Sequence, residues 1–245
     1  MRYALYGRIV LGLSAVVYGI AGLLWSDSVA WQLAHLFSLL ISTPIAWCLA
    51  IAQAVFGVGI VFDRSERVSS IVLGIIYTLF ALSSVPGMVA APLDPGQYVN
   101  FGEQLSLACG ALAVYTFGEA SAERATRLGR IARIVLGLCT LSFAWAQVVY
   151  LQYTASLVPA WIPPSQVFWT WLTTIAFALA GIAMLINVQA RLAMRLTTLM
   201  IALFGIIVWV PHILAEPHKL QNYDEISSNY LMAAAIWLVA EVRSF

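Results

Sequence analysis

Long stretches without Asp, Glu, Lys or Arg constrain this chain more than any other feature of its sequence. The longest covers residues 134–190, and others cover residues 28–62, 68–93 and 196–215. A helix needs about 20 apolar residues to cross the hydrocarbon core of a bilayer. These stretches are therefore long enough for membrane-spanning helices, and the longest can hold two helices with a turn between them.

The composition excludes most other classes of protein. Of the 245 residues, 62% are apolar and only 9% are charged, with a net charge of +1. Soluble domains carry about 25% charged residues, so this chain lacks the polar groups to cover a water-exposed surface. Its twelve basic residues form no basic stripe, so nucleic acid is not an expected partner. Continuous apolar runs also exclude a strand barrel, which needs alternation. The sequence therefore predicts an all-α polytopic membrane protein whose first partner is the lipid bilayer.

Eight transmembrane helices account for the charge-free stretches and their polar ends. Two stretches, residues 104–118 and 226–240, reach full length only when they include polar ends such as Glu103 and Glu241. The predicted helices cover residues 7–25, 44–62, 68–89, 103–118, 131–151, 166–187, 193–213 and 226–242.

The basic residues predict the orientation of these helices. In an eight-helix arrangement, all the arginines fall on one side of the membrane and Lys219 alone falls on the other. The arginines are Arg2, Arg8, Arg64, Arg67, Arg124, Arg127, Arg130, Arg133, Arg191, Arg195 and Arg243. Basic residues remain cytoplasmic. Both termini are therefore expected in the cytoplasm, in a bacterial-type plasma membrane (an inner membrane).

Parts of the sequence recur at an offset of 125 residues. The hexapeptide Arg-Ile-Val-Leu-Gly-Leu occurs at residues 8–13 and again at 133–138. Further matches follow in order: Val85-Pro86 with Val210-Pro211, Pro92 with Pro217, Tyr98 with Tyr223 and, with one gap, Gly57 with Gly181 and Arg67 with Arg191. Ordered matches of this kind indicate a tandem duplication.

The duplication predicts two parallel four-helix bundle repeats. The first unit covers residues 1–118, a cytoplasmic linker covers 119–130, and the second unit covers 131–245. Because each unit has an even number of helices, the two units should be related by a pseudo-two-fold axis along the membrane normal. The first helix also fits a cleavable signal peptide. Its copy at 131–151 cannot be one, which favours retention of residues 7–25.

Each unit resembles the DoxX-like family of small four-helix membrane proteins. The resemblance rests on the Arg-Ile-Val-Leu-Gly-Leu opening, the Gly-rich second helix (Phe56-Gly57-Val58-Gly59-Ile60), the Arg turn, the third helix ending in Val-Pro, and the Asn/Glu-initiated last helix. Most members of that family have one unit, so two fused units are a departure. The family includes a membrane subunit of a thiosulfate:quinone oxidoreductase. The resemblance therefore implies a quinone- or thiol-linked redox role, and it supplies no catalytic motif.

Tryptophans crowd the outer half of the predicted bundle, and only Trp237 lies near the inner half. Aromatic belts normally occupy both interfaces, so some of these rings are expected to line a pocket that opens to the outer leaflet, where a quinone or lipid could stack. The alternatives are a one-sided belt and, for the mid-span glutamines, hydrogen bonding between helices. Non-spanning segments at 27–43 and 152–165 would cover such a pocket. The candidate ligand-binding residues are Trp31, Trp47, Gln53, Gln147, Trp161, Trp169 and Trp209.

Titratable residues on the outer side give two further hypotheses. His212, Glu216 and His218 surround the end of the seventh helix, and imidazole with carboxylate can bind Zn or Fe; the alternative is a set of interfacial polar residues held by water. Glu103 and Glu225 stand near the start of the last helix of each unit. They either cap that helix or line an outer cavity between the units and relay protons.

The sequence leaves three functions open. The first is an accessory, redox-associated membrane subunit that binds a quinone or lipid and docks a redox protein partner or a second copy of itself. The second is a transporter or permease for a small solute, and the third is a structural or assembly partner. No catalytic motif occurs in the sequence. At most, therefore, the chain is a membrane subunit of an oxidoreductase, and quinone is the one cofactor that the resemblance suggests.

Overall fold

A computed structural model describes residues 2–34 and 39–242, and within these residues every regular element is a helix. Eight predicted helices fall on eight helical segments. These segments are α1 (Arg2–Leu24), α3 (Leu39–Gly59), α4 (Glu66–Ser83) with α5 (Val85–Ala90), α6 (Pro95–Phe117), α7 (Ala122–Val149), α9 (Gln166–Ile186), α10 (Ala190–Phe204) with η1 (Gly205–Trp209) and α11 (Val210–Ala215), and α12 (Leu220–Glu241). Two short helices complete the chain, α2 (Val29–Ala34) and α8 (Leu151–Leu157).

Several helices begin earlier than the charge-free stretches predict. The α6 helix begins at Pro95 because Asp94 caps it: the Asp94 carboxylate accepts a hydrogen bond of 2.9 Å from the Gly96 N–H. The Ser121 hydroxyl likewise accepts from the Arg124 N–H and starts α7. Most of the predicted linker at 119–130 is therefore the first part of α7. Polar first turns escaped the hydropathy pattern because capping, not burial in lipid, stabilises them.

Five helices of the described residues are long and apolar enough to cross a membrane, as expected for an integral membrane protein. They are Ala4–Leu24, Glu66–Ala90, Ala122–Val149, Gln166–Ile186 and Ala190–Ala215, and a shorter apolar helix covers Thr43–Gly59. The α6 and α12 helices, which begin with polar turns, are not among these candidates.

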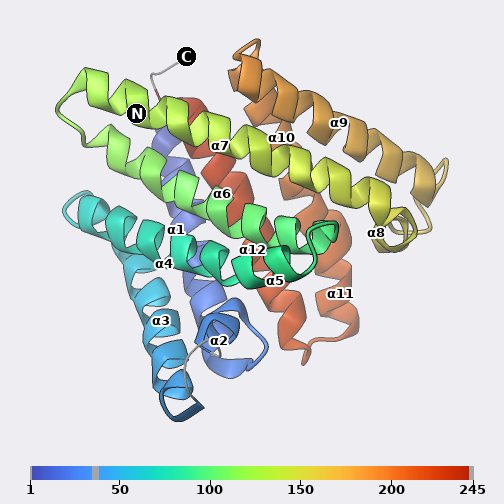
Figure 1. Cartoon of the computed structure of the whole chain (residues 1–245), viewed down its shortest axis with the longest axis horizontal. Helices are drawn as coiled ribbons and strands as arrows, with labels where there is room; N and C mark the ends of the chain where they lie inside the picture. The colour runs from blue at the N-terminus through green and yellow to red at the C-terminus, as the bar shows by residue number, and fades with distance from the viewer. Residues whose placement is uncertain (1, 35–38, 243–245) are drawn as a thin grey trace.

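The α6 and α12 helices form the centre of the bundle (Figure 1). The α12 helix contacts α1, α6 and α10, and the α6 helix contacts α4, α7 and α12. Their backbones approach closely where Gly110 meets Ala235, since a Cβ added at Gly110 would lie 2.4 Å from the Ala235 Cβ. Because protein rather than lipid surrounds these two helices, they tolerate polar residues that a lipid-facing helix would exclude.

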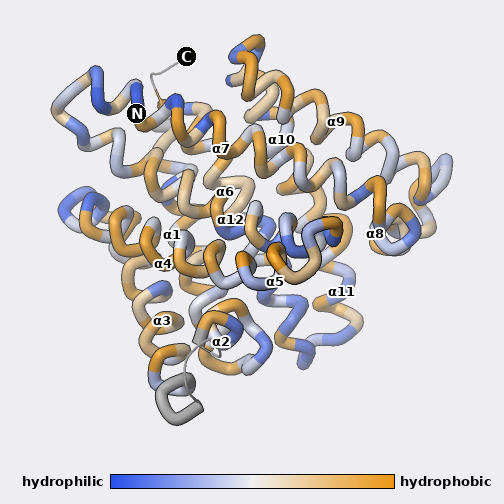
Figure 2. The backbone as a smooth tube through the Cα atoms, viewed as in Figure 1, coloured by the Kyte–Doolittle hydropathy of each residue, from blue (hydrophilic) through white to orange (hydrophobic). Residues whose placement is uncertain are grey.

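The segments that connect the long helices lie at the two ends of the bundle. The α3–α4, α6–α7 and α9–α10 connections lie at the same end as both termini, and α2, α5, α8 and α11 lie at the other (Figure 1). Hydrophobic residues run along the long helices between these ends, and hydrophilic residues gather at connections (Figure 2).

Arg8 links α1 to the α3–α4 connection, at the end of the bundle that holds the termini. Its guanidinium donates hydrogen bonds to the carbonyl oxygens of Ile60 (3.1 Å) and Val61 (2.8 Å) at the end of α3. The same side chain pairs with Asp63 at 3.0 Å and with Glu66 at 2.5 Å. Arg8 is buried, so these four partners satisfy a charge that would otherwise be costly to bury.

Candidate functional site

A cavity of about 830 Å³ lies at the α8 and α11 end of the bundle, between α6, α7, α9, α10 and α12. Residues of α8 and the following loop cover it, including Tyr153 and Pro159, and η1 contributes Trp209. Phe177 and Met232, which are both buried, also line it. This volume matches that of pockets for drug-sized ligands, and the lining is mostly apolar, as in such pockets.

The cavity reaches the surface between α9 and α10. Leu196 and Leu199 of α10 line it although their exposed fractions are 57% and 56%. Leu172 of α9 lines it from the other side and is also exposed. Leucines in this position would face lipid chains in a bilayer. A lipid-like molecule could therefore enter the cavity sideways without crossing water.

Two glutamates are among the polar residues that line the cavity, Glu103 from α6 and Glu225 from α12. Their carboxyl groups lie close enough for their charges to interact. Two amide side chains, Asn100 and Asn229, line the cavity beside them, and the Asn229 side chain donates to the Glu225 carbonyl oxygen at 3.0 Å. None of the lining residues is Lys, Arg or His.

The positions of Glu103 and Glu225 exclude the capping hypothesis and place both residues in a cavity lining, while their proposed proton relay stays a prediction. Because α6 begins at Pro95 and α12 at Leu220, neither glutamate caps its helix. The capping hypothesis is therefore wrong, since earlier residues start both helices. Both glutamates do line a cavity bounded by helices from the two halves of the chain.

A third carboxyl group, Asp94, lies in the cavity lining but is already satisfied. The Tyr150 hydroxyl donates to its Oδ1 atom, and the Gly96 N–H donates to the same oxygen. These hydrogen bonds hold the pKa of Asp94 below its ordinary value, and the bond from Tyr150 has the largest effect. The same bond raises the pKa of Tyr150. Asp94 and Tyr150 thus join α6 to α7 in the cavity wall.

Three of the seven predicted ligand-binding residues line this cavity: Gln147, Trp169 and Trp209. The Gln147 Oε1 accepts hydrogen bonds from the hydroxyls of Thr174 (2.8 Å) and Thr173 (3.3 Å) on α9. The indole N–H of Trp169 donates to the Pro163 carbonyl oxygen at 2.9 Å. The Trp169 ring is thus fixed by the loop that covers the cavity, and it also packs against the Phe168 ring.

The other four lie elsewhere. The Gln53 side chain is buried and donates to the Tyr77 hydroxyl at 3.3 Å, which joins α3 to α4. The Trp31 indole N–H donates to the Gly22 carbonyl oxygen at 3.0 Å. Trp47 is exposed on α3, and Trp161 is exposed in the loop after α8. The structure therefore does not gather the seven residues into one pocket.

The three candidate metal ligands do not form a metal-binding cluster. Among residues 2–34 and 39–242, no group of three or more His, Cys, Asp or Glu side chains is placed to hold a metal ion. His212 uses its Nδ1 atom in a 2.7 Å hydrogen bond with the Val208 carbonyl oxygen. Glu216 pairs with Lys219 at 3.2 Å, and His218 is exposed. The structure gives each of these residues its own local role.

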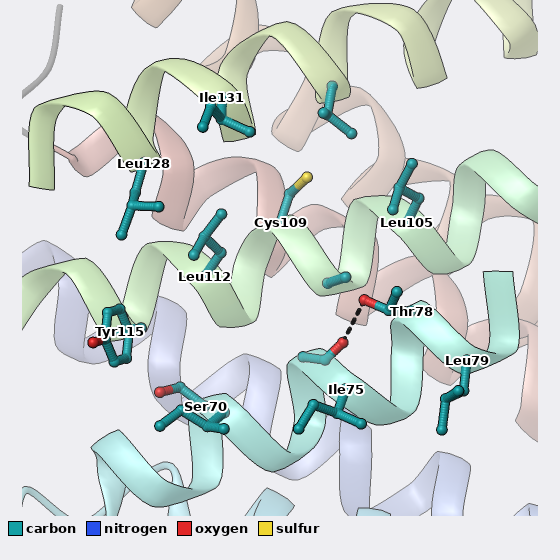
Figure 3. A pocket seen from close by; sticks show the side chains of 14 residues that line it. Ser70, Ile75, Thr78, Leu79, Leu105, Cys109, Leu112, Tyr115, Leu128 and Ile131 are labelled. Atoms are coloured by element: carbon teal, nitrogen blue, oxygen red, sulfur yellow. Dashed lines mark hydrogen bonds between the residues drawn. The ribbon is translucent and has the colours of Figure 1, made fainter. Parts of the chain in front are cut away.

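A second hollow, of about 560 Å³, lies on the opposite flank of α6, between α4 and α7 (Figure 3). Leu105, Leu112 and Ile131 line it with other apolar side chains. The Thr78 hydroxyl in its wall donates to the Gly74 carbonyl oxygen of its own helix at 2.7 Å (Figure 3). With no charged group in its lining, this hollow fits a lipid chain packed against the protein better than a specific ligand.

Comparisons with protein-family models, with curated proteins and with solved structures found no match.

Proposed function

We propose that the chain crosses a bacterial-type plasma membrane eight times, with both termini in the cytoplasm. The three helices beyond the five candidate spans fit this topology, because α3 is apolar but short and α6 and α12 are enclosed by other helices. The arginines of the described chain belong to the end that holds the termini. The single lysine, Lys219, lies at the other end. This asymmetry is the one that cytoplasmic retention of basic residues produces.

The proposed tandem duplication is supported by contacts that recur at matching positions. A Cβ at Gly12 would meet the Gly57 carbonyl oxygen, and one at Gly137 would lie 3.1 Å from the Gly181 carbonyl oxygen. The Tyr98 hydroxyl donates to the Pro92 carbonyl oxygen at 3.1 Å, as the hydroxyl at position 223 does to the carbonyl at 217 at 3.0 Å. Helix contacts recur as well: α6 contacts α7 as α12 contacts α1, and α6 meets α12 at the centre.

The π-helix η1 fits the second of two one-residue changes in offset between the proposed units. Arg67 and Arg191 differ by 124 positions, whereas Val85 and Val210 differ by 125. The extra residue therefore falls between positions 191 and 210, where η1 (Gly205–Trp209) is found. A π turn accommodates one more residue than an α turn, and such turns are frequent at functional sites. Here it contributes Trp209 to the cavity.

We propose further that the second unit, together with α6, binds a lipid-like molecule taken sideways from the outer leaflet. The observation that carries this proposal is the cavity itself, which is mostly apolar, is bordered by exposed leucines of α9 and α10, and holds the two glutamates Glu103 and Glu225 among its polar residues. A quinone, with a flat ring and an apolar tail, is one candidate, because the Trp169 and Trp209 rings could stack on it. The resemblance to the DoxX-like family makes an accessory subunit of a redox complex the corresponding role.

The position of the cavity favours this role over a transporter. A permease built from two rocking units would be expected to hold its substrate near the midplane, between the units. This cavity instead extends from the α8 end to the middle of α9 and, apart from Asp94 and α6, its lining comes from the second unit alone.

A cavity-filling substitution tests the binding function. Ala176 lines the cavity on α9, whereas Leu179 on the same helix lies on its exposed face. We expect wild type and Leu179→Trp, extracted into nanodiscs without detergent, to retain a lipid-like molecule that mass spectrometry identifies. Ala176→Trp should lose it while keeping a similar melting temperature. Equal retention by all three proteins would refute binding in this cavity.

A further inference from the structure

The charge of the cavity lining is one-sided. Asp94, Glu103 and Glu225 line it, and no basic residue does. Since Asp94 receives hydrogen bonds from Tyr150 and from a backbone N–H, the uncompensated negative charge is that of Glu103 and Glu225. The cavity lining offers these two carboxyl groups no cationic side chain, although Gln221 hydrogen-bonds Glu225. An ionised carboxyl group in such a place is costly until a cation pairs with it.

Asp224 adds a further acidic side chain next to Glu103 and Glu225. Asp224 precedes Glu225 on α12, is 9% exposed, and interacts electrostatically with both Glu103 and Glu225. One of its oxygens, Oδ1, is buried without a hydrogen-bond partner among the described residues. The lysine closest in sequence, Lys219, pairs with Glu216 outside the cavity. When these carboxyl groups are ionised, they give the cavity a negative potential that no basic residue of its lining neutralises.

Aromatic rings stand in the same cavity. Trp169, Trp209 and Tyr150 line it, and the indole N–H of Trp169 and the hydroxyl of Tyr150 are already used in hydrogen bonds. Their rings are the aromatic surface that the cavity lining offers to a ligand. Carboxylates combined with tryptophan and tyrosine faces are the recognition chemistry for alkylammonium groups.

We infer that the occupant of the cavity is an amphiphile with a positively charged ammonium group, held by Glu103 and Glu225, with its apolar part toward Phe177 and Met232. This inference rests on the proposed binding function and names the chemistry of its ligand. An ammonium group could belong to a membrane lipid or to another lipophilic amine, since both present the same charge and a comparable apolar tail.

Two probes with the same tail separate the charge from the apolar contribution. Wild-type protein in nanodiscs of an uncharged galactolipid is titrated calorimetrically with dodecyltrimethylammonium and with neutral dodecyl glucoside, and empty nanodiscs give the background. The Glu103→Gln/Glu225→Gln double variant removes both charges at nearly constant volume. The matched control is Glu216→Gln, which removes an exposed carboxylate at the same end of the bundle but outside the cavity lining.

We expect wild type and Glu216→Gln to prefer the ammonium probe, and the double variant to bind it at least about thirtyfold more weakly. Affinity for the neutral probe should be unchanged in all three, which also shows that the double variant folds. Equal affinity of wild type for both probes, or an unchanged affinity of the double variant for the ammonium probe, would overturn the inference and leave the proposed binding function intact. Failure of both probes to bind wild type would instead count against the proposed function.

Mass spectrometry of the native occupant distinguishes its sources. An ammonium-bearing lipid retained by wild type and lost from the double variant would identify the bilayer as the source. Preference for dodecyltrimethylammonium without such a lipid would identify a different amphiphilic amine. A retained molecule that is neutral or anionic, and equally retained by the double variant, would contradict the inference.

Discussion

Close contact between the backbones of α1 and α3 makes Gly12 a position that is sensitive to enlargement. A Cβ added at Gly12 would lie 2.5 Å from the Gly57 carbonyl oxygen and 2.7 Å from a Val61 methyl group. The carbonyl is part of a helix backbone and cannot rotate away, so α1 and α3 would have to separate. Overpacking of this kind costs about 1–3 kcal/mol. Small residues that let helices approach are the usual means of association in membranes.

Two other glycines provide a graded comparison. A Cβ at Gly137 would meet the Leu185 side chain at 3.0 Å, and that flexible side chain can move. A Cβ at Gly74 would find only the Ala111 Cβ at 3.7 Å, an ordinary contact. Replacement of a helical glycine by alanine otherwise stabilises a helix by about 0.5–1 kcal/mol. Gly12→Ala should therefore lose about 2 kcal/mol, Gly137→Ala less, and Gly74→Ala should gain up to about 1 kcal/mol.

The free energy of unfolding can be compared by titrating SDS into mixed micelles and following helix content by circular dichroism. Each alanine variant is measured beside wild type in the same detergent mixture. From the most to the least stable, the predicted order of the variants is Gly74→Ala, Gly137→Ala and Gly12→Ala. If Gly12→Ala is as stable as Gly74→Ala, the backbones of α1 and α3 do not meet as described.

Two further outcomes test the anchoring of the bundle and its topology. Arg8→Met should lower the free energy of unfolding by about 3 kcal/mol, because it leaves the Glu66 carboxylate and two carbonyl groups without their partner. The control Arg67→Met replaces an exposed arginine and should change the free energy of unfolding by less than about 1 kcal/mol. Equal losses for the two variants in the same SDS titration would contradict the role of Arg8. The topology can be tested in a cysteine-free background by adding an impermeant maleimide to intact cells. It should label Ala160→Cys in the loop after α8, and it should label Ala122→Cys at the start of α7 only after the cells are opened. The reverse pattern would refute the proposed orientation.

Helix positions followed from the sequence because each depends on residues close together in the chain. An apolar run of sufficient length forms a helix wherever it packs, so all eight predicted segments fall on helices. The starts of α6 and α12 were missed because they depend on polar residues. Asp94 and Pro95 begin a helix through a side-chain cap and a fixed φ angle, neither of which a search for charge-free stretches detects.

The candidate site was only partly accessible from the sequence. Gln147, Trp169 and Trp209 share a cavity because the faces of α7, α9 and η1 that carry them line the same space. Gln53 has the same mid-span character as Gln147, yet its helix turns it toward Tyr77. Tyr150 and Asn229 were missed, since nothing in their local sequence distinguishes them from other interfacial polar residues.

The sequence by itself indicated that lipid surrounds this protein, that its fold is all-helical and that its charged residues gather at the ends of the helices. Hydropathy and charge act residue by residue, so a count along the chain is enough to read them. Only the tertiary structure decided which residues enclose the cavity, because rotation and close approach of whole helices bring Glu103 and Glu225 together from positions more than a hundred residues apart.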